Sequence, residues 1–219
     1  MNILVVSPHP DDETLGAGGT LLRLKQEGQQ IFWLNITNVT QDSPGAASFY
    51  AVRQRQIQQI RQFYQFDGFH DLALPPCTLS CMDENELIGK IGNYFSAVQP
   101  DWVILPDPED AHSDHKAVYN ACMSCTKVFR YPYIKKVTTM EILSESDFSK
   151  NGTAFSPNYF VDISATLDDK LNAMKIYDTE LGGVPFPRRL DTLQALATVR
   201  GAASGVRYAE AFRIIKWIE

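Results

Sequence analysis

Short apolar runs alternate with segments of helical periodicity along most of the chain. Residues 2–7, 31–37 and 102–105 are apolar runs of strand length, and Pro106 and Pro108 end the last of them. Weaker strand patterns cover residues 69–72, 137–143, 159–163 and 211–218. Helical patterns run from residue 16 to a glycine stop at 28, then over residues 49–64, 83–98, 113–129, 164–177 and 192–202.

Specific residues mark the starts of three of these helices. Asp83 and Glu86 form a capping-box pattern, Ser113 or Asp114 can cap the next helix, and Ser164 the one after. Strand–helix alternation predicts an α/β fold, namely a Rossmann-like, doubly wound, mainly parallel sheet with helices on both faces. No repeat, low-complexity tract or linker interrupts the pattern, so we expect residues 1–219 to form a single domain.

Composition excludes several classes of protein. The 219 residues include 20 Lys+Arg and 26 Asp+Glu, a formal net charge of −6, without a basic cluster. We therefore expect no nucleic-acid partner. No apolar run approaches the roughly 20 residues of a membrane helix. The amino terminus lacks the basic region of a signal peptide, so we expect no membrane span and a cytoplasmic protein.

Histidine is the informative residue type. Three of the four histidines lie in two acidic clusters: His9 within the sequence PHPDDE, and His112 and His115 within DAHSDH. Each cluster follows a predicted strand, the first and the fourth along the chain. In a doubly wound sheet these two strands commonly flank the crevice at which the strand order reverses. We therefore expect the two clusters to meet in space.

The residue types in these clusters suit a catalytic metal site. His9, Asp12 and His115 form a 2-His-1-carboxylate set that leaves positions open for water, as in catalytic zinc sites, and the same ligand types suit non-haem iron. Asp11 cannot easily share the metal with its neighbour and is free to act as a general base. His112 can contact the reacting group without ligating. The competing interpretation is that these polar residues only cap turns and helices, but their joint position at two strand ends makes this the weaker one.

Two other patterns have structural interpretations. The glycine run at residues 16–20 lacks the third glycine of a dinucleotide fingerprint, so we expect it to permit close helix packing. The cysteine pairs Cys77/Cys81 and Cys122/Cys125 have spacings compatible with a structural zinc site. Because the second pair lies in a predicted helix, where cysteines commonly pack as small apolar groups, we expect free thiols.

Taken together, the motifs resemble those of the LmbE-like (PIG-L) family of zinc-dependent sugar de-N-acetylases. The resemblance covers nearly the whole chain. Its strongest elements are PHPDDE followed by GAGGT at residues 8–20, and HSDH at residues 112–115. Weaker matches are FVDIS at 160–164, K-x-x-A-x-x-x-Y at 170–177 and YAEAF at 208–212. One departure is YDTE at residues 177–180, where relatives usually have Y-x-S-Q.

The resemblance implies a role for each site residue. His9, Asp12 and His115 would bind zinc, Asp11 would be the general base, His112 a second catalytic group, and Arg53 would help to hold the substrate. The implied reaction removes the acetyl group from an N-acetylglucosamine-type sugar or its conjugate, releasing acetate and a free amine. Asp11 would take the proton of the attacking water, and protonated His112, with zinc, would stabilise the oxyanion. The resemblance is also consistent with a homo-oligomer.

Other functions stay open. A metal-dependent hydrolase of another amide or small acyl group would use the same residues. A zinc-binding module without turnover would not need Asp11, and a Rossmann-type nucleotide binder ranks third. The acceptor sugar is not readable from the sequence, because the loops expected to shape the pocket, residues 40–50, 75–82 and 185–189, carry no simple code.

Overall fold

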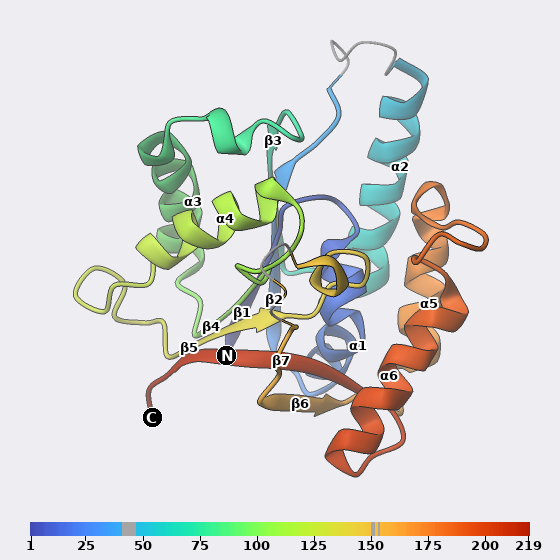
Figure 1. Ribbon diagram of the computed structural model, residues 1–219. Helices are drawn as coiled ribbons and strands as arrows, with labels where there is room; N and C mark the ends of the chain where they lie inside the picture. Colours follow the sequence, from blue (N-terminus) through green and yellow to red (C-terminus); the bar gives the residue numbers. More distant parts are fainter. Residues whose placement is uncertain (41–46, 150–151, 153) are drawn as a thin grey trace.

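Seven strands of the described residues form one sheet, and helices cover both of its faces (Figure 1). The computed structural model describes residues 1–40, 47–149, 152 and 154–219. The strands are β1 (Asn2–Ser7), β2 (Gln30–Thr37), β3 (Gly68–Leu74), β4 (Trp102–Leu105), β5 (Lys136–Met140), β6 (Tyr159–Asp162) and β7 (Ala209–Trp217). The helices are α1 (Asp12–Gln26), α2 (Ala47–Tyr64), α3 (Glu84–Val98), α4 (Ser113–Ser124), α5 (Leu167–Ile176) and α6 (Leu190–Ser204). Short 3-10 turns cover Leu79–Cys81, Ser146–Phe148 and Asp178–Glu180.

The strand order confirms the predicted mainly parallel α/β fold. The order is β3-β2-β1-β4-β5-β7-β6, and the first five strands of this order run parallel. β7 runs antiparallel to both of its neighbours, which the sequence pattern did not predict. The chain leaves β1 in one direction to reach β2 and crosses to its other side to form β4. The carboxyl ends of β1 and β4 therefore flank the crevice at which the strand order reverses.

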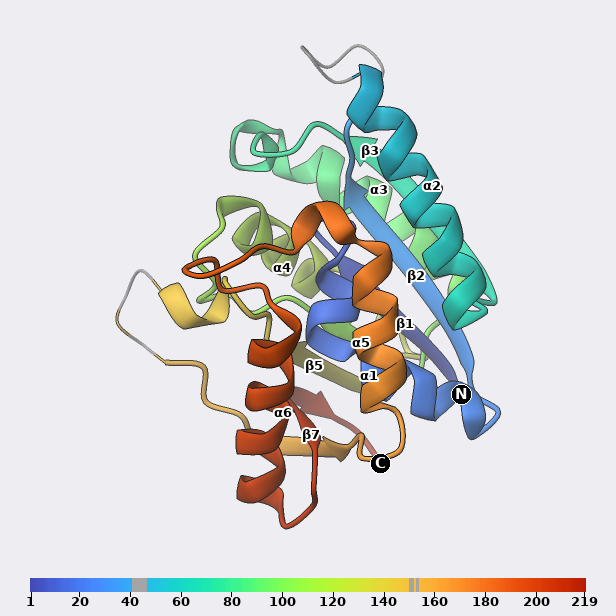
Figure 2. The ribbon, with the colours of Figure 1, turned by 90° about the vertical axis from the view of Figure 1, so that its right-hand side faces the viewer.

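Alternating side chains of the central strand divide the core into two layers. Ile3 and Val5 of β1 face the layer formed with α1, α2, α5 and α6, which lies toward the viewer in Figure 2. Leu4 and Val6 face the opposite layer, formed with α3 and α4. All four side chains are fully buried, which explains why β1 is a continuous apolar run. In the described part of the chain, no helix is long and apolar enough to cross a bilayer.

Several element boundaries differ from the predicted ones. α1 begins at Asp12 and not at residue 16, since carboxylates in a first turn interact favourably with the helix dipole. α4 ends at Ser124 and not at residue 129, because the next two N–H groups turn back to carbonyls three residues earlier. β5 ends at Met140 and not at residue 143, and the N-cap of α5 is Thr166 and not Ser164. The predicted cap at Asp83 is confirmed, since its carboxylate accepts two backbone N–H groups of α3.

The glycines of α1 allow the helix to lie close against its neighbours. A Cβ atom at Gly16 would lie 2.7 Å from the side chain of Met140, and one at Gly19 would lie 2.8 Å from that of Ile163. The expectation of close packing at this run is therefore confirmed. Any larger residue would push the start of α1 away from the sheet.

A buried ion pair fixes the middle of α1. The carboxylate of Glu210, on β7, accepts the backbone N–H groups of Gly19 (2.9 Å) and Thr20 (2.7 Å). It also pairs with the ammonium of Lys170, on α5, at 2.6 Å, and that ammonium donates to the Leu15 carbonyl at 2.8 Å. Both charged side chains are about 5% exposed. They join α1, α5 and β7 through the interior.

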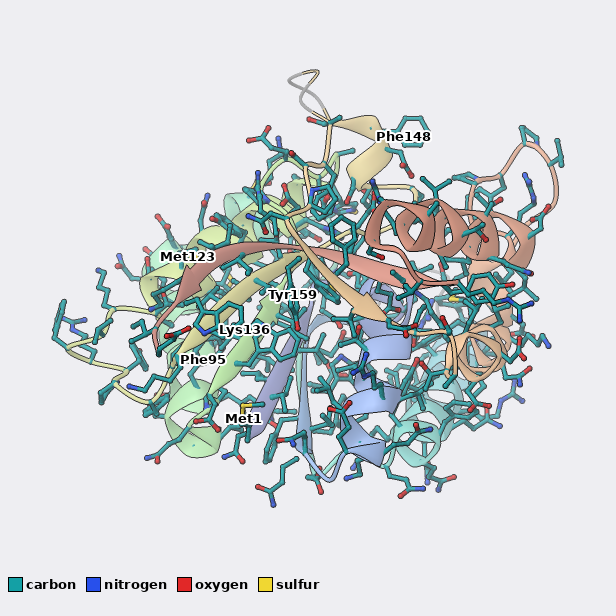
Figure 3. All side chains as sticks on the ribbon, turned by 90° about the horizontal axis from the view of Figure 1, so that it is seen from below. Met1, Phe95, Met123, Lys136, Phe148 and Tyr159 are labelled. Carbon is teal, nitrogen blue, oxygen red and sulfur yellow. The ribbon has the colours of Figure 1, made fainter. Side chains whose placement is uncertain are left out.

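The end of the sheet at which the parallel strands begin carries a different contact. Figure 3 shows Lys136 of β5 beside Tyr159 of β6. The Lys136 Nζ lies 3.7 Å from the ring centroids of both Trp102 and Tyr159. Burial lowers the pKa of Lys136 to about 8. This cation–aromatic contact links three strands at the end opposite the histidine clusters.

The buried ion pair of Glu210 and Lys170 leads to a prediction about stability. In a Glu210→Gln variant the buried Lys170 charge loses its partner, and we expect the free energy of unfolding to fall by about 3–5 kcal/mol. Glu27→Gln removes the exposed partner of Arg23 and should cost about 0–1 kcal/mol. Urea unfolding followed by circular dichroism measures both values. Equal effects of the two substitutions would contradict a structural role for the buried pair.

Candidate active site

Residues of the two histidine clusters meet at the carboxyl ends of β1 and β4. These strands pair directly, with Val5 opposite Ile104. His9 lies in the loop that follows β1, Asp12 opens α1, and His115 lies in the first turn of α4. Asp12 is 3% exposed and His115 is fully buried. The fold therefore places the expected residues of both clusters at one point.

Three side-chain atoms face one another at nearly equal distances. His115 Nε2 lies 3.3 Å from His9 Nδ1 and 3.4 Å from Asp12 Oδ2, and the latter two atoms are 3.5 Å apart. Ligand bonds of about 2.0–2.2 Å in a tetrahedral zinc site place neighbouring ligand atoms roughly 3.3–3.5 Å apart. The set of one carboxylate and two imidazoles therefore fits a metal ion with an open coordination position.

A carboxylate orients each imidazole of this set from its other nitrogen. His115 Nδ1 lies 2.8 Å from Asp110 Oδ2, and His9 Nε2 lies 3.2 Å from Asp114 Oδ2. An imidazole that donates its N–H to such a carboxylate turns the lone pair of its second nitrogen the other way. In both histidines, that second nitrogen belongs to the three-atom set.

The orienting carboxylates are themselves fixed by neighbouring groups. The hydroxyl of Ser146 donates to Asp110 at 2.7 Å. The backbone N–H groups of Cys77 and Leu79 donate to Asp114 at 2.7 and 3.2 Å. Both aspartates are fully buried. Their positions depend on loops far from either histidine in the sequence.

The electrostatics of this cluster favour a positive charge. Burial lowers the pKa of His9, but hydrogen bonds with Asp114 and Asp12 outweigh it and raise that pKa to about 10. Burial also lowers the pKa of His115, and the charge of Asp12 and the hydrogen bond with Asp110 raise it above its usual value. Burial raises the pKa of Asp12, yet the His115 charge and the His9 hydrogen bond lower it to about 2. Protons or a divalent cation can supply this positive charge.

Asp11 lies beside the three-atom set without belonging to it. Its Oδ2 accepts a hydrogen bond from Arg188 Nη1 at 2.7 Å, and the residue is 2% exposed. Burial and the charge of Asp12 raise the pKa of Asp11 to about 8, against the opposing charge of Arg188. A carboxylate that titrates near neutral pH can accept a proton and return it.

Glu13 holds the backbone at Asp11. The φ angle of Asp11 is 150°, in a region that non-glycine residues rarely adopt. The Glu13 carboxylate accepts the Asp11 N–H at 3.2 Å and the hydroxyls of Thr14 and Tyr177 at 2.7 and 3.0 Å. Burial raises the pKa of Glu13 to about 7. This network fixes the strained turn between β1 and α1.

His112 is the N-cap of α4, a role that the sequence assigned to Ser113 or Asp114. Its Nδ1 accepts the backbone N–H of Asp114 at 3.1 Å, which leaves the proton of a neutral ring on Nε2. Burial and the positive charge of His9 lower the pKa of His112. Nε2 is therefore the ring nitrogen that can donate to a substrate atom, and the protonated state expected from the sequence stays a prediction. Nε2 lies 3.7 Å from Cys77 Sγ.

Arg53 reaches the same pocket but has protein partners there. Its Nη1 donates to the Pro10 carbonyl at 3.0 Å, and its Nη2 forms an ion pair with Glu180. The guanidinium also lies 5.1 Å from the ring centroid of Phe49. Arg53 is 5% exposed, so it positions the loop around Pro10 in addition to lining the pocket.

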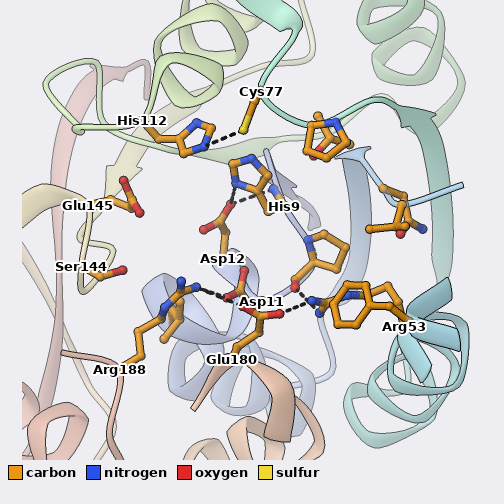
Figure 4. Close-up of a pocket in the computed structure, with 17 residues that line it drawn as sticks. His9, Asp11, Asp12, Arg53, Cys77, His112, Ser144, Glu145, Glu180 and Arg188 are labelled. Atoms are coloured by element: carbon orange, nitrogen blue, oxygen red, sulfur yellow. Dashed lines mark hydrogen bonds and ion pairs between the residues drawn. The ribbon is translucent and has the colours of Figure 1, made fainter. Parts of the chain in front are cut away.

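These residues surround a cavity of about 280 Å³ (Figure 4). His9, Asp11 and Asp12 form one wall, and Figure 4 shows Arg188 and Glu180 close to Asp11. Further lining comes from Thr37, Asn38, Val39, Phe49, Arg53, Pro76, Cys77, His112, Ser144 and Glu145. Three loops were expected to shape the pocket, and residues of all three line the cavity. Residues 41–46 of the first loop lie outside the described residues.

The cysteines are free thiols, as expected. Cys77 and Cys81 are exposed, whereas Cys122 and Cys125 are buried in the layer of α3 and α4. Burial raises the pKa of Cys122 well above its usual value. The candidate metal clusters among the described residues contain histidine and aspartate but no cysteine. In the part of the chain that the structure describes, the four cysteine sulfurs do not converge as a ligand group.

The structure thus places His9, Asp11, Asp12, Arg53 and His112 in the lining of one cavity. His115 does not line the cavity but contacts His9 and Asp12. Sequence reasoning missed Glu13, Asp110, Arg188 and Glu180, and it treated Asp114 only as a cap. The acidic composition of the two clusters was a signal for Glu13, Asp110 and Asp114. Arg188 lies in the loop of residues 185–189 that was expected to shape the pocket, but its pairing with Asp11 was not predicted. Its neighbour Arg189 pairs with Asp191 at the surface, and only the fold separates their roles.

The fold and the cluster together define a doubly wound α/β protein with a candidate metal site at its strand switch point. The sequence model of the GlcNAc-PI de-N-acetylase family (PIG-L) matches residues 4–126 of the chain. This segment is more than half of the chain and contains both histidine clusters. The chain belongs to this family.

Individual relatives and structures agree with this assignment. The chain is 25% identical to diacetylchitobiose deacetylase of Thermococcus kodakarensis, over 99% of this chain and 84% of that protein. It is 29% identical to a probable N-acetyl-α-D-glucosaminyl L-malate deacetylase 2 of Bacillus cereus, over 79% of this chain and 80% of that protein. The crystal structure of the conserved protein TT1542 from Thermus thermophilus superposes with a TM-score of 0.80 at 25% identity, covering 99% of this chain and 96% of that one.

Proposed function

We propose that this protein is a metal-dependent deacetylase that removes the acetyl group from an N-acetylated amino sugar or its conjugate. The observation that supports this proposal most strongly is the three-atom set of His9, Asp12 and His115. Beside it lies Asp11, a buried carboxylate outside that set. A purely ligating site has no need of this fourth group. Relatives named for N-acetyl sugar deacetylation support the substrate class.

His9, Asp12 and His115 would hold the metal ion. Zinc is the proposed ion, and iron(II) suits the same ligand types. Such an ion supplies Lewis-acid polarisation of the acyl carbonyl and makes water acidic enough to react near neutral pH. Asp110 and Asp114 keep the two imidazoles turned toward it.

The protein groups divide the proton transfers between them. Asp11 accepts a proton as water attacks the acetyl carbon, and the carbonyl oxygen then carries the negative charge. The Nε2–H of His112 donates a hydrogen bond to that oxygen. Asp11 returns its proton to the nitrogen as the C–N bond breaks. The products are a free amine and acetic acid, which balances the addition of one water, and the acid then ionises to acetate.

Arg53 and Arg188 would act through the groups that they touch. Arg188 fixes one oxygen of Asp11, so that the carboxylate keeps one orientation. Arg53 fixes the Pro10 carbonyl in the loop that carries His9 and Asp11. A contact of Arg53 with the substrate is also part of the proposal, since the residue lines the cavity.

Removal of a proposed ligand should remove the metal. We expect about one zinc ion per chain in the wild-type protein and strong loss in His115→Ala and Asp12→Ala, because two remaining ligands bind too weakly. His70→Ala is the matched control, since His70, on β3, stacks on Tyr94 of α3 and takes no part in the cluster. Elemental analysis after dialysis measures the metal content. Full zinc content in both ligand variants would overturn the assignment.

Asp11 should be needed for turnover but not for the metal. We expect Asp11→Asn to lower kcat for acetate release from N,N′-diacetylchitobiose by about 10²–10⁴-fold, because the amide cannot accept the proton. Zinc content should stay unchanged. Asp169→Asn, the same substitution at an exposed position of α5, serves as the control. Nearly full activity of Asp11→Asn would refute its role as base.

The same assay separates the proposed function from its alternative. A panel of N-acetylated amino acids, run beside N-acetyl sugars, tests hydrolysis of another amide. Acetate release from the amino acids alone would favour that alternative.

A further inference from the structure

The charged groups of the cavity are already paired with one another. Arg53 and Arg188 are the guanidinium groups that line it within the described part of the chain. Arg53 pairs with Glu180, and Arg188 pairs with Asp11 at 2.7 Å and with Glu180 at 3.5 Å. One carboxylate, that of Glu180, therefore bridges both arginines through its two oxygens (Figure 4).

Among the described residues, each arginine of the lining has a carboxylate partner. The described lining contains four carboxyl side chains, those of Asp11, Asp12, Glu145 and Glu180, and two arginines. A substrate that carried its own carboxylate or phosphate into the cavity would meet no unpaired guanidinium group among the described lining residues. It would also have to compete with Asp11 and Glu180 for the two guanidinium groups.

The remaining lining suits an uncharged sugar. The Glu145 side chain has no hydrogen-bond or ion-pair partner among the described residues, so its oxygens can accept from sugar hydroxyls. Phe49 adds an aromatic ring to the wall, on which the apolar face of a sugar ring can pack. Such contacts need no charge on the ligand.

We propose that this cavity selects uncharged N-acetyl saccharides and discriminates against N-acetyl sugars conjugated to a carboxylate or phosphate. The inference rests on the proposed deacetylase function and specifies its substrate class. Glu180 is the specificity-determining residue, because its carboxylate occupies both cations that an anionic conjugate would need.

A matched pair of substrates tests this selectivity. The pair is the N-acetylglucosaminide of malic acid and the same compound as its dimethyl ester, which differ in charge while sharing the sugar and the linkage. We expect kcat/KM for acetate release to be at least tenfold higher for the ester. We also expect the difference to shrink as ionic strength rises, because an electrostatic cause is screened and a steric one is not.

A substitution of Glu180 tests whether this residue causes the selectivity. Glu180→Gln frees the two arginines from their shared carboxylate and should raise the acid-to-ester ratio of kcat/KM at least fivefold. Glu27→Gln, an exposed change at the far end of α1, should leave that ratio at the wild-type value. The ratio is the readout, so a general loss of activity in Glu180→Gln does not mimic the effect. The wild-type comparison also decides the question if this variant does not fold.

The outcomes separate the two proposals. Equal kcat/KM values for acid and ester, or a preference for the acid, would overturn the selectivity while acetate release upholds the deacetylase function. An unchanged ratio in folded Glu180→Gln would overturn the role of Glu180. No acetate from these compounds or from N,N′-diacetylchitobiose would overturn the deacetylase function, and the selectivity with it.

Discussion

Two buried carboxylates that lie outside the three-atom set give the candidate site its shape. Asp110 and Asp114 hold His115 and His9 by one ring nitrogen each, so that the second nitrogens converge within 3.3 Å of one another. These contacts fix the orientation of both imidazole rings. The loops that fix Asp110 and Asp114 come from other parts of the chain. The site therefore depends on several loops at the carboxyl ends of the parallel strands.

The position of α1 is the second requirement, because Asp11 and Asp12 lie at its start. The helix approaches the sheet closely at Gly16 and Gly19, and the pair of Lys170 and Glu210 fixes its middle. Glu13 then joins its first turn to Tyr177 at the end of α5. The motifs near residues 170 and 210 therefore act at a distance, by holding the helix that carries the acidic pair.

Local patterns predicted the parts of the molecule that depend on neighbouring residues. The apolar run of β1 and the cap at Asp83 follow from burial and backbone hydrogen bonding, and the meeting of both histidine clusters follows from the topology of parallel sheets. Contacts between distant segments were not predictable. The Arg188–Asp11 pair spans 177 positions, and no spacing rule distinguishes Arg188 from Arg189. The capping contact of His112 was likewise not predicted, and it replaced the two caps expected from residue preferences.

In the proposed function, two imidazoles and one carboxylate hold a metal ion at the β1/β4 crevice. X-ray absorption spectroscopy at the zinc edge of the metal-loaded protein detects the ligand atoms themselves. We expect a first shell of nitrogen and oxygen atoms at about 2.0–2.2 Å, with two imidazole scattering patterns. A sulfur shell at about 2.3 Å, or a shell without imidazole, would contradict it.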